Sequence, residues 1–238
     1  MLRYIKDKAS KDYILVMKYA SEGSLRNNLR SIAQMDWKDK INLLQCIASD
    51  LQIIHSHDLI HCDLHSGNIL QSNLKSAYIA DLELSITANI ALKSKSDRIC
   101  GILPYIAPEV LNNQQYTKAS DIYSLGIIMW EILYVCNGLR PHIYENTAKC
   151  YANLMKKCWS TEPKERPTAA EICDIFAEWL NNESILFELF ESNKLQNIKN
   201  EDMHVYNDSH YKSCFILSNN DYKDSELYEL EVPDFIDE

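Results

Sequence analysis

The segment LIHCDLHSGNIL, residues 59–70, decides how this chain of 238 residues is organised. Short apolar runs alternate here with polar side chains, so the segment matches neither the period of about 3.6 residues of a helix nor a long strand. Such a pattern is typical of loops and short strands that present polar groups to a cleft. We therefore expect functional residues in this segment.

A long amphipathic helix is predicted before this segment. From Trp37 onward, apolar residues recur every three or four positions, at residues 37, 41, 44, 47, 48, 51 and 54. This period predicts one helix with a single buried face, ending near residues 57–58. Earlier in the chain, YILVM at residues 13–17 predicts a β-strand, and SEGS at residues 21–24 predicts a turn that begins another helix.

Buried helices are predicted after the segment. AYIADL, residues 77–82, is another short apolar run, whereas residues 120–133 are apolar nearly all round, which is typical of a core helix. The longest apolar run, residues 125–136, is shorter than the ~20 residues needed to cross a bilayer, so we expect no transmembrane segment. Further helices are expected at residues 146–159 and 168–180.

Charge is distributed unevenly along the chain. Residues 181–238 contain fourteen Asp and Glu and four Lys and Arg, which accounts for the whole formal net charge of −10. The remaining body is neutral and lacks the clustered cations of a nucleic-acid surface, and an acidic tail repels anionic membranes. We expect neither nucleic acid nor membrane among the partners, and a largely disordered tail after a helical stretch at residues 185–190.

The cysteines indicate a reducing compartment. None of the eight forms a C-x-x-C pair, and the first residues lack the apolar core of a secretory signal. We therefore expect a cytoplasmic or nuclear protein that is neither secreted nor transmembrane. An apolar fraction of 46% is ample for a globular core.

Four short motifs occur in a fixed order along the chain, and four ordered motifs are far more specific than one. They are HCDLHSGN at residues 61–68, DLE at 81–83, APE at 107–109 and SDIYSLG at 120–126. Together they resemble the catalytic loop, the metal-binding motif, the end of the activation segment and the central helix of protein kinases. Cys158-Trp159 and Arg166-Pro167 are similar to the tyrosine-kinase and tyrosine-kinase-like groups.

The resemblance implies an α+β, protein-kinase-like fold. It would consist mainly of the α-helical C-terminal lobe, with a remnant strand or hairpin of the N-terminal lobe. The implied domains are residues 1–19 as the small-lobe remnant and hinge, residues 20–182 as the C-terminal lobe, and residues 183–238 as the acidic tail.

The resemblance also assigns roles to individual residues. Asp63 would orient a substrate hydroxyl and accept its proton, Asn68 would hold one Mg²⁺, and Asp81 would hold the Mg²⁺ that bridges the nucleotide phosphates. His61 and Leu82 match positions that pack between the catalytic loop and the core.

Further scaffold and nucleotide-binding positions follow from the same resemblance. Asp121 matches a buried helix residue that binds the backbone of the catalytic loop, and Glu109 with Arg166 resembles the ion pair that ties the activation segment to the lobe. The residues that would bind ATP around its adenine are Met17, the gatekeeper position, and Lys18, Tyr19, Ala20 and Leu70.

The chain departs from the family pattern in several places. Its five glycines form no G-x-G-x-x-G, and no V-A-I-K strand precedes the hinge-like segment. Cys62 replaces the Arg that would read an activation-segment phosphate, and Glu83 replaces a Gly and adds negative charge beside the metals. A loop and most of a substrate-docking helix are absent between Leu133 and Asn137.

Two site hypotheses compete with plainer interpretations. His55, His57, His61 and His65 could form a metal cluster, but their spacing fits no known zinc site, so we favour a helix end followed by a loop. Ser94 and Ser96, beside basic residues, could be phosphorylation sites, although exposed loops are rich in serine in any case.

The sequence therefore predicts a protein kinase that uses ATP and Mg²⁺ to phosphorylate Ser or Thr, with Tyr as a weaker option. Because the clamp on the nucleotide phosphates is missing, we expect this chain alone to be impaired or inactive. The alternative is a pseudokinase-like module that binds partners. A protein substrate or signalling partner is expected in either case, and the oligomeric state is not predicted.

Overall fold

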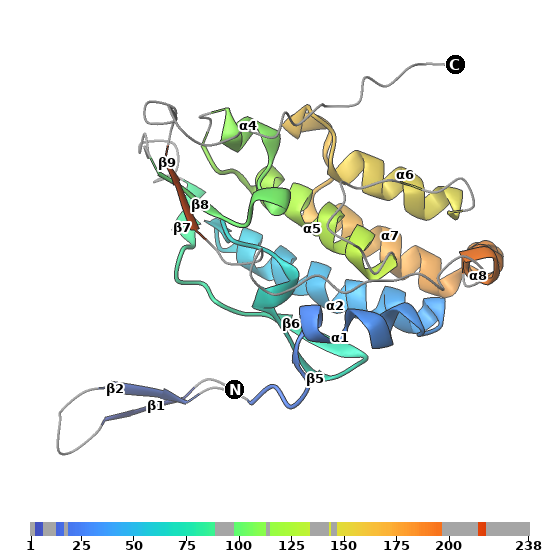
Figure 1. The fold of residues 1–238 in the computed structure, drawn as a ribbon, viewed down its shortest axis with the longest axis horizontal. Helices are drawn as coiled ribbons and strands as arrows, with labels where there is room; N and C mark the ends of the chain where they lie inside the picture. Colours follow the sequence, from blue (N-terminus) through green and yellow to red (C-terminus); the bar gives the residue numbers. More distant parts are fainter. Residues whose placement is uncertain are drawn as a thin grey trace, which may run out of the picture.

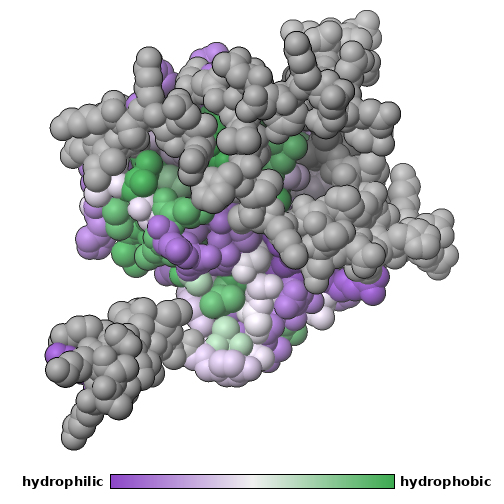
Figure 2. Space-filling model, turned by 60° about the vertical axis from the view of Figure 1, so that its left-hand side comes forward, coloured by the Kyte–Doolittle hydropathy of each residue, from purple (hydrophilic) through white to green (hydrophobic). Residues whose placement is uncertain are grey.

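The computed structural model describes residues 3–6, 13–16, 19–88, 98–112, 115–133, 143, 147–196 and 214–217. Figure 1 shows a helical body with short strands along one side and a separate N-terminal hairpin. This is the α+β architecture, dominated by helices, that the sequence predicted. On the side turned forward in Figure 2, hydrophobic residues gather in a patch bordered by hydrophilic ones.

The helices carry most of the structure. They are α1 (Leu25–Ala33), α2 (Trp37–Ser56), α4 (Pro108–Leu111), α5 (Lys118–Leu133), α6 (Lys149–Cys158), α7 (Ala169–Asn181) and α8 (Glu183–Gln196). Short 3₁₀ turns η1, η2 and η3 lie at Ser66–Asn68, Leu103–Tyr105 and Pro163–Glu165. The predicted helices are confirmed, with boundaries that differ by a few residues.

The strands are short and antiparallel. β1 (Arg3–Lys6) pairs with β2 (Tyr13–Val16), which confirms the predicted strand as far as residue 16. β3 (Gly23–Ser24), β5 (Ile69–Asn73) and β6 (Ser76–Ile79) form a sheet in the order β3-β5-β6. Two further ladders join β4 (Leu59–Ile60) to β7 (Ile86–Thr87), and β8 (Arg98–Gly101) to β9 (Cys214–Leu217).

Side-chain caps explain where several helices begin. The Asp36 carboxylate accepts the Asp39 backbone N–H at 2.8 Å before α2, and Thr168 forms a capping box with Glu171 at α7. At α5, the predicted start at Ser120 is two residues late. Thr117 and Ser120 bond each other's backbone N–H, so Thr117 serves as the cap and the helix begins at Lys118.

One hydrophobic core joins the long helices. Thirteen of the sixteen residues of α5 are buried, as expected for a helix that is apolar nearly all round. An aromatic group fills the space between α2, α6 and α7, because the Tyr151 ring lies 4.9 Å from Trp37 and 6.1 Å from Trp179 between centroids. The Tyr151 hydroxyl donates to the Met129 carbonyl at 2.8 Å, so its polar end is satisfied inside the core.

α8 belongs to this core as well. Leu189 is fully buried, and Ile185 and Leu186 pack against the core cluster from the same helix. The helix extends to Gln196, beyond the stretch at residues 185–190 that the sequence indicated. In the part of the chain that is described, no helix is long and apolar enough to cross a membrane.

A buried lysine stands out in α2. The Lys40 side chain is 1% exposed, and its Nζ lies 5.2 Å from the centre of the Trp37 ring. Burial disfavours the charged form and lowers the pKa of Lys40 to about 8, and the Asp36 carboxylate offsets this only partly.

The lowered pKa predicts a pH-dependent stability. Between pH 8 and 10.5 the unfolded chain holds this proton more firmly than the folded chain, so the free energy of unfolding should rise with pH by about 2 to 3 kcal/mol. Urea denaturation across this range measures it. Lys40→Met should abolish this rise of the free energy of unfolding with pH, whereas Lys38→Met, at an exposed position, should keep it. The same rise in wild type and both variants would contradict the prediction.

Candidate functional site

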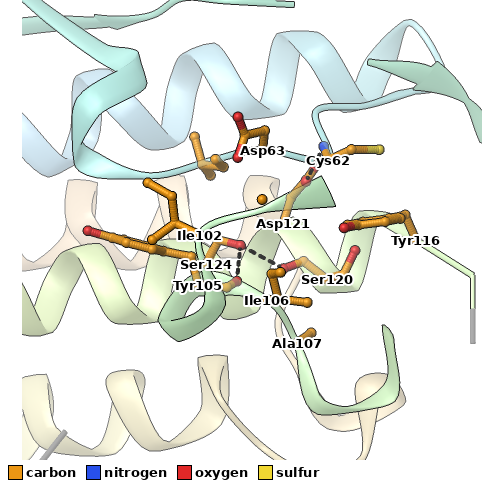
Figure 3. Close-up of a pocket in the computed structure, with 12 residues that line it drawn as sticks. Cys62, Asp63, Ile102, Tyr105, Ile106, Ala107, Tyr116, Ser120, Asp121 and Ser124 are labelled. Atoms are coloured by element: carbon orange, nitrogen blue, oxygen red, sulfur yellow. Dashed lines mark hydrogen bonds between the residues drawn. The ribbon is translucent and has the colours of Figure 1, made fainter. Parts of the chain in front are cut away.

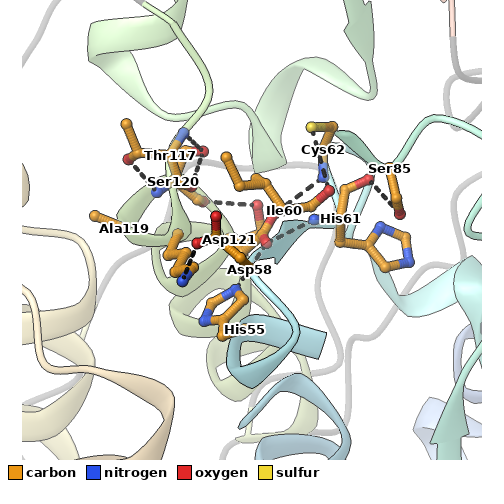
Figure 4. A network of polar contacts seen from close by, with 12 residues as sticks. His55, Asp58, Ile60, His61, Cys62, Ser85, Thr117, Ala119, Ser120 and Asp121 are labelled. Carbon is orange, nitrogen blue, oxygen red and sulfur yellow. Dashed lines mark hydrogen bonds and ion pairs between the residues drawn. The ribbon is translucent and has the colours of Figure 1, made fainter. Parts of the chain in front are cut away.

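A buried carboxylate of α5 organises the loop at residues 61–65. Asp121 is 1% exposed, and its two oxygens accept the backbone N–H groups of His61 at 2.8 Å and Cys62 at 3.1 Å. The His55 Nε2 atom, from α2, lies 2.9 Å from the same carboxylate (Figure 4). Three donors from two other segments thus converge on one side chain, as predicted for this residue.

The backbone beside these bonds adopts a conformation that side chains rarely take. Cys62 has φ = 69°, and Asp58 and Asp81 have φ of 57° and 63°. Left-handed non-glycine residues cost about 1 to 3 kcal/mol each and persist only where surrounding contacts impose them. The Asp121 bonds to two successive N–H groups impose this conformation at Cys62, which sets the direction in which the following residue, Asp63, leaves the loop.

The predicted catalytic and metal-binding residues are linked through the backbone. Asp63 is 8% exposed, and the Asn68 amide donates to its carbonyl at 2.9 Å and lies 3.4 Å from its carboxylate. The Asn68 carbonyl accepts the Ala80 N–H at 2.8 Å, which ties this loop to the residue before Asp81. The His61 ring reinforces the link, because its Nε2 lies 3.0 Å from the Ala80 carbonyl oxygen.

A second histidine faces the Asp63 carboxylate. The His65 Nδ1 atom accepts the Gly67 backbone N–H at 3.0 Å, so the ring proton lies on Nε2. That nitrogen is 3.6 Å from the Asp63 carboxylate, and both side chains are largely buried. His65 therefore lies between the backbone of η1 and Asp63.

A buried polar network lies behind this loop. The Tyr105 hydroxyl donates to the Glu131 carboxyl at 2.6 Å and lies 3.0 Å from the Ser66 hydroxyl. The Arg26 guanidinium, from α1, donates to Ser66 at 3.3 Å. Burial raises the pKa of Glu131, while the bond from Tyr105 opposes that rise. The network connects α1, η1, η2 and α5 across the core.

A pocket opens between the loop and the chain that precedes α4. Figure 3 shows Asp63 on one side of it and Tyr105 and Ile106 on the other. Gly101 lines it too, with φ = 144°, a value that favours glycine. A Cβ at this position would lie 3.3 Å from Ile106 and 3.5 Å from the Asp63 carboxylate, so the backbone passes close to Asp63.

An ion pair holds the end of this segment. The Arg166 guanidinium donates two bonds to the Glu109 carboxylate, at 2.6 and 2.7 Å, and both side chains are buried. Arg166 also donates to the carbonyls of Ala119 and Ser160 and lies over the Tyr123 ring. The predicted pair is confirmed, and its geometry is the planar, two-bond arrangement typical of Arg with a carboxylate.

The predicted adenine-binding residues are only partly described. Met17 and Lys18 lie outside the described residues, and Tyr19 is 85% exposed. The Ala20 carbonyl accepts the Gly23 N–H at 3.1 Å at the start of β3, and β3 pairs with β5 next to Leu70. The structure thus places Leu70 in the small sheet opposite Ser24, and Ala20 in the turn that leads into β3.

Comparison with known proteins identifies the family. A family model of the protein kinase domain matches residues 2–180. The chain belongs to the protein kinase family. Its similarity extends to a probable serine/threonine-protein kinase of Dictyostelium discoideum, 33% identical over 183 residues, which cover 68% of this chain and 14% of that protein.

Two further relatives come from distant sources. A putative serine/threonine-protein kinase/receptor of Acanthamoeba polyphaga mimivirus is 29% identical over 190 residues, 72% of this chain and 11% of that protein. The interferon-induced, double-stranded RNA-activated protein kinase of Mus musculus is 33% identical over 182 residues, 69% of this chain and 35% of that protein. The chain therefore spans about a tenth to a third of the length of these kinases.

One expectation from the kinase resemblance is wrong. Leu82 was expected to pack between the catalytic loop and the core, but it is 49% exposed. The left-handed backbone at Asp81 turns the chain, and residues 81–83 are all exposed. His61, the other residue expected in this role, is fully buried and bonded to Ala80.

The four histidines have separate partners, as the plainer interpretation implied. His55 bonds Asp121, His61 bonds the Ala80 carbonyl, and His65 lies beside Asp63. His57 is exposed and bonds the Ile53 carbonyl at the end of α2. His55, His61 and His65 thus each contact a different group around the loop, whereas His57 bonds within its own helix end.

Several site residues could not be recognised from the sequence. His65 lies two positions after Asp63, so its distance to that carboxylate depends on how η1 turns the chain. Tyr105 and Glu131 carry no motif that links them. At Cys62, the sequence shows only that the Arg of the family pattern is replaced. In the structure, burial and nearby carboxylates raise the pKa of the Cys62 thiol, which is therefore uncharged at neutral pH.

The convergence on Asp121 predicts a large loss of stability upon truncation. Asp121→Ala leaves the His61 and Cys62 N–H groups without acceptors, so we expect about 3 kcal/mol less free energy of unfolding in urea. Asp174→Ala, at an exposed position of α7, is the matched control and should change stability by less than about 0.5 kcal/mol. Similar losses in the two variants would refute the proposed role of the carboxylate.

Proposed function

We propose that this lobe supports transfer of the γ-phosphoryl group of ATP to a protein hydroxyl, with Asp63 as the base. The observation that carries the proposal is the position of Asp63. Its carboxylate lines a pocket, contacts the Asn68 amide and lies near His65 Nε2. A base held in this way can orient a hydroxyl and accept its proton. Ser and Thr are the favoured acceptors because the relatives are named serine/threonine kinases.

Asn68 and Asp81 suit the Mg²⁺ ions that such a reaction uses. The side-chain amide nitrogen of Asn68 is bonded to Asp63. The side-chain oxygen of Asn68, Oδ1, is therefore the atom that could serve as a metal ligand. Asp81 adds a carboxylate, and both are hard oxygen donors. Mg²⁺ in such sites is typically held by one or two carboxylates together with substrate phosphates. When bound, Mg²⁺ would neutralise charge on those phosphates.

The hinge segment completes the proposed nucleotide site. Met17, Lys18, Tyr19 and Ala20 would contact adenine, with Leu70 beneath it. The Ala20 carbonyl binds the first residue of β3, and β3 pairs with β5, the strand that contains Leu70. The sequence contains no Gly-rich phosphate loop, so we expect slow transfer by this chain on its own.

A binding role without catalysis is the second candidate. Glu83 is exposed two residues after Asp81 and adds negative charge where a nucleotide would bring its phosphates. That repulsion favours a pseudokinase-like module that engages a protein partner. The two candidates differ in whether Mg-ATP binds and whether Asp63 matters.

Catalysis predicts that phosphoryl transfer depends on Asp63. Asp63→Asn should lower transfer of radiolabel from ATP to myelin basic protein by about 100-fold, because the amide cannot accept the hydroxyl proton. Asp174→Asn, an exposed residue of α7, should retain the wild-type rate. Equal signals from wild type and Asp63→Asn would show that Asp63 is not the base.

Nucleotide binding predicts a change in thermal stability. Mg-ATP at ten times its Kd should raise the melting temperature by about 3 to 5 °C, since a ligand that binds only the folded state stabilises it. Asp81→Asn should abolish this shift, whereas Asp174→Asn should retain it. A folded protein with no shift at millimolar Mg-ATP would favour the binding module instead.

A further inference from the structure

A segment of the acidic tail pairs with the chain beside the site. β9 (Cys214–Leu217) pairs antiparallel with β8 (Arg98–Gly101), and Figure 1 shows the two strands side by side. The register places Leu217 opposite Arg98 and Cys214 opposite Gly101. The ladder therefore ends at Gly101, where an added Cβ would lie 3.5 Å from the Asp63 carboxylate.

The body of the lobe holds β8 in position from the other side. Ile99 is 7% exposed and belongs to a cluster with Ile106, Ala107 and Val110. Gly101, two residues along the same strand, lies against Ile106. Residues 99 and 101 share one face of β8, because strand side chains alternate. The strand is thus fixed on the lobe through this face, and its backbone edge is directed to β9.

The backbone edge of a strand such as β8 can bind extended peptides of many sequences. Backbone N–H and C=O groups pair with any extended segment, and side-chain pockets add selectivity. A protein segment that paired with β8 would be aligned with its end at Gly101, next to the pocket that contains Asp63. Such alignment is what a kinase needs to bring a hydroxyl to its base.

We propose that the edge of β8 is the docking strand for an extended segment of the protein substrate, and that β9 occupies it as an intramolecular competitor. The tail strand would then lower phosphorylation of other proteins by covering their docking edge. This inference deepens the function proposed above and rests on it. The pairing of β8 with β9 does not depend on catalysis and can be tested separately.

The composition of the tail fits this role. CFIL at residues 214–217 is the longest apolar run after residue 196, in a segment otherwise rich in Asp, Asn, Ser and Glu. Phe and Ile favour extended pairing. Among the described strands, β8 and β9 pair only with each other, and an isolated two-stranded ladder is marginally stable in water. A tethered competitor has a high effective concentration, of order mM, yet a substrate can displace so short a ladder.

Hydrogen exchange tests the pairing without any assay of activity. Ile216→Pro removes a backbone donor in the middle of β9 and should release the ladder. The backbone amides of residues 98–101 in the full chain should then exchange about tenfold faster than in wild type. Asn220→Pro, outside β9, is the matched control and should leave these amides unchanged. Equal exchange in all three proteins would overturn the proposal.

Kinetics and peptide binding test the competition. With myelin basic protein as substrate, Ile216→Pro should lower KM about threefold or more and leave kcat unchanged, as expected when a competitor is removed. A fluorescent peptide of residues 210–221 should bind Ile216→Pro about fivefold more tightly than wild type, and a scrambled peptide should bind neither.

The outcomes separate the two proposals. Transfer that depends on Asp63 but has the same KM in wild type and Ile216→Pro would overturn the competitor and leave the kinase function standing. If no transfer depends on Asp63, the kinase function fails, and peptide binding then decides whether β8 is a docking edge. Equal peptide affinity for wild type and Ile216→Pro would overturn the docking edge as well.

Discussion

The carboxylate of Asp121 is the contact on which the rest of the site depends. It is buried and accepts bonds from His55 at the end of α2 and from two successive N–H groups of the loop. A buried charge is costly unless such donors surround it, so the arrangement is stable only when all three segments are in place. The left-handed backbone at Cys62, and with it the position of Asp63, follows from this requirement.

Two other buried contacts extend this control to the chain that faces Asp63. Tyr105 bonds Glu131 below the pocket, and Glu109 pairs with Arg166 at the start of α4. A buried ion pair contributes little net stability, because desolvation offsets its attraction. Its effect here is positional, since Arg166 also bonds two backbone carbonyls and so fixes Glu109 relative to α5. The wall of the pocket opposite Asp63 is therefore as firmly placed as Asp63 itself.

The elements that sequence analysis predicted are those governed by local rules. Apolar period and capping residues gave α2, α5 and α7 to within two residues, because burial of one helix face and satisfaction of its first N–H groups are local effects. The resemblance of the ordered motifs to protein kinases predicted that Asp121 binds the loop backbone, which is confirmed, whereas the roles of Asp63 and Asn68 stay predictions. Contacts set by tertiary structure were not predictable: the exposure of Leu82 depends on a left-handed turn, and the bond between Tyr105 and Glu131 joins segments with no common pattern. The pairing of β9 with β8 is of the same kind, since a four-residue apolar run in a polar tail has no pattern that specifies its partner.

Cys62 stands where the kinase pattern has an Arg, and this replacement bears on how the chain that faces Asp63 is ordered. An uncharged thiol at this position cannot attract an activation-segment phosphate, so the chain from β8 to α4 is ordered by contacts that need no phosphate. The structure provides them through Ile99 in its hydrophobic cluster and through Glu109 with Arg166. With both ends fixed in this way, the element that can change is the segment paired with the edge of β8, which in this structure is β9. Access of a protein substrate to the site would then depend on the strand that pairs with this edge and not on a phosphate.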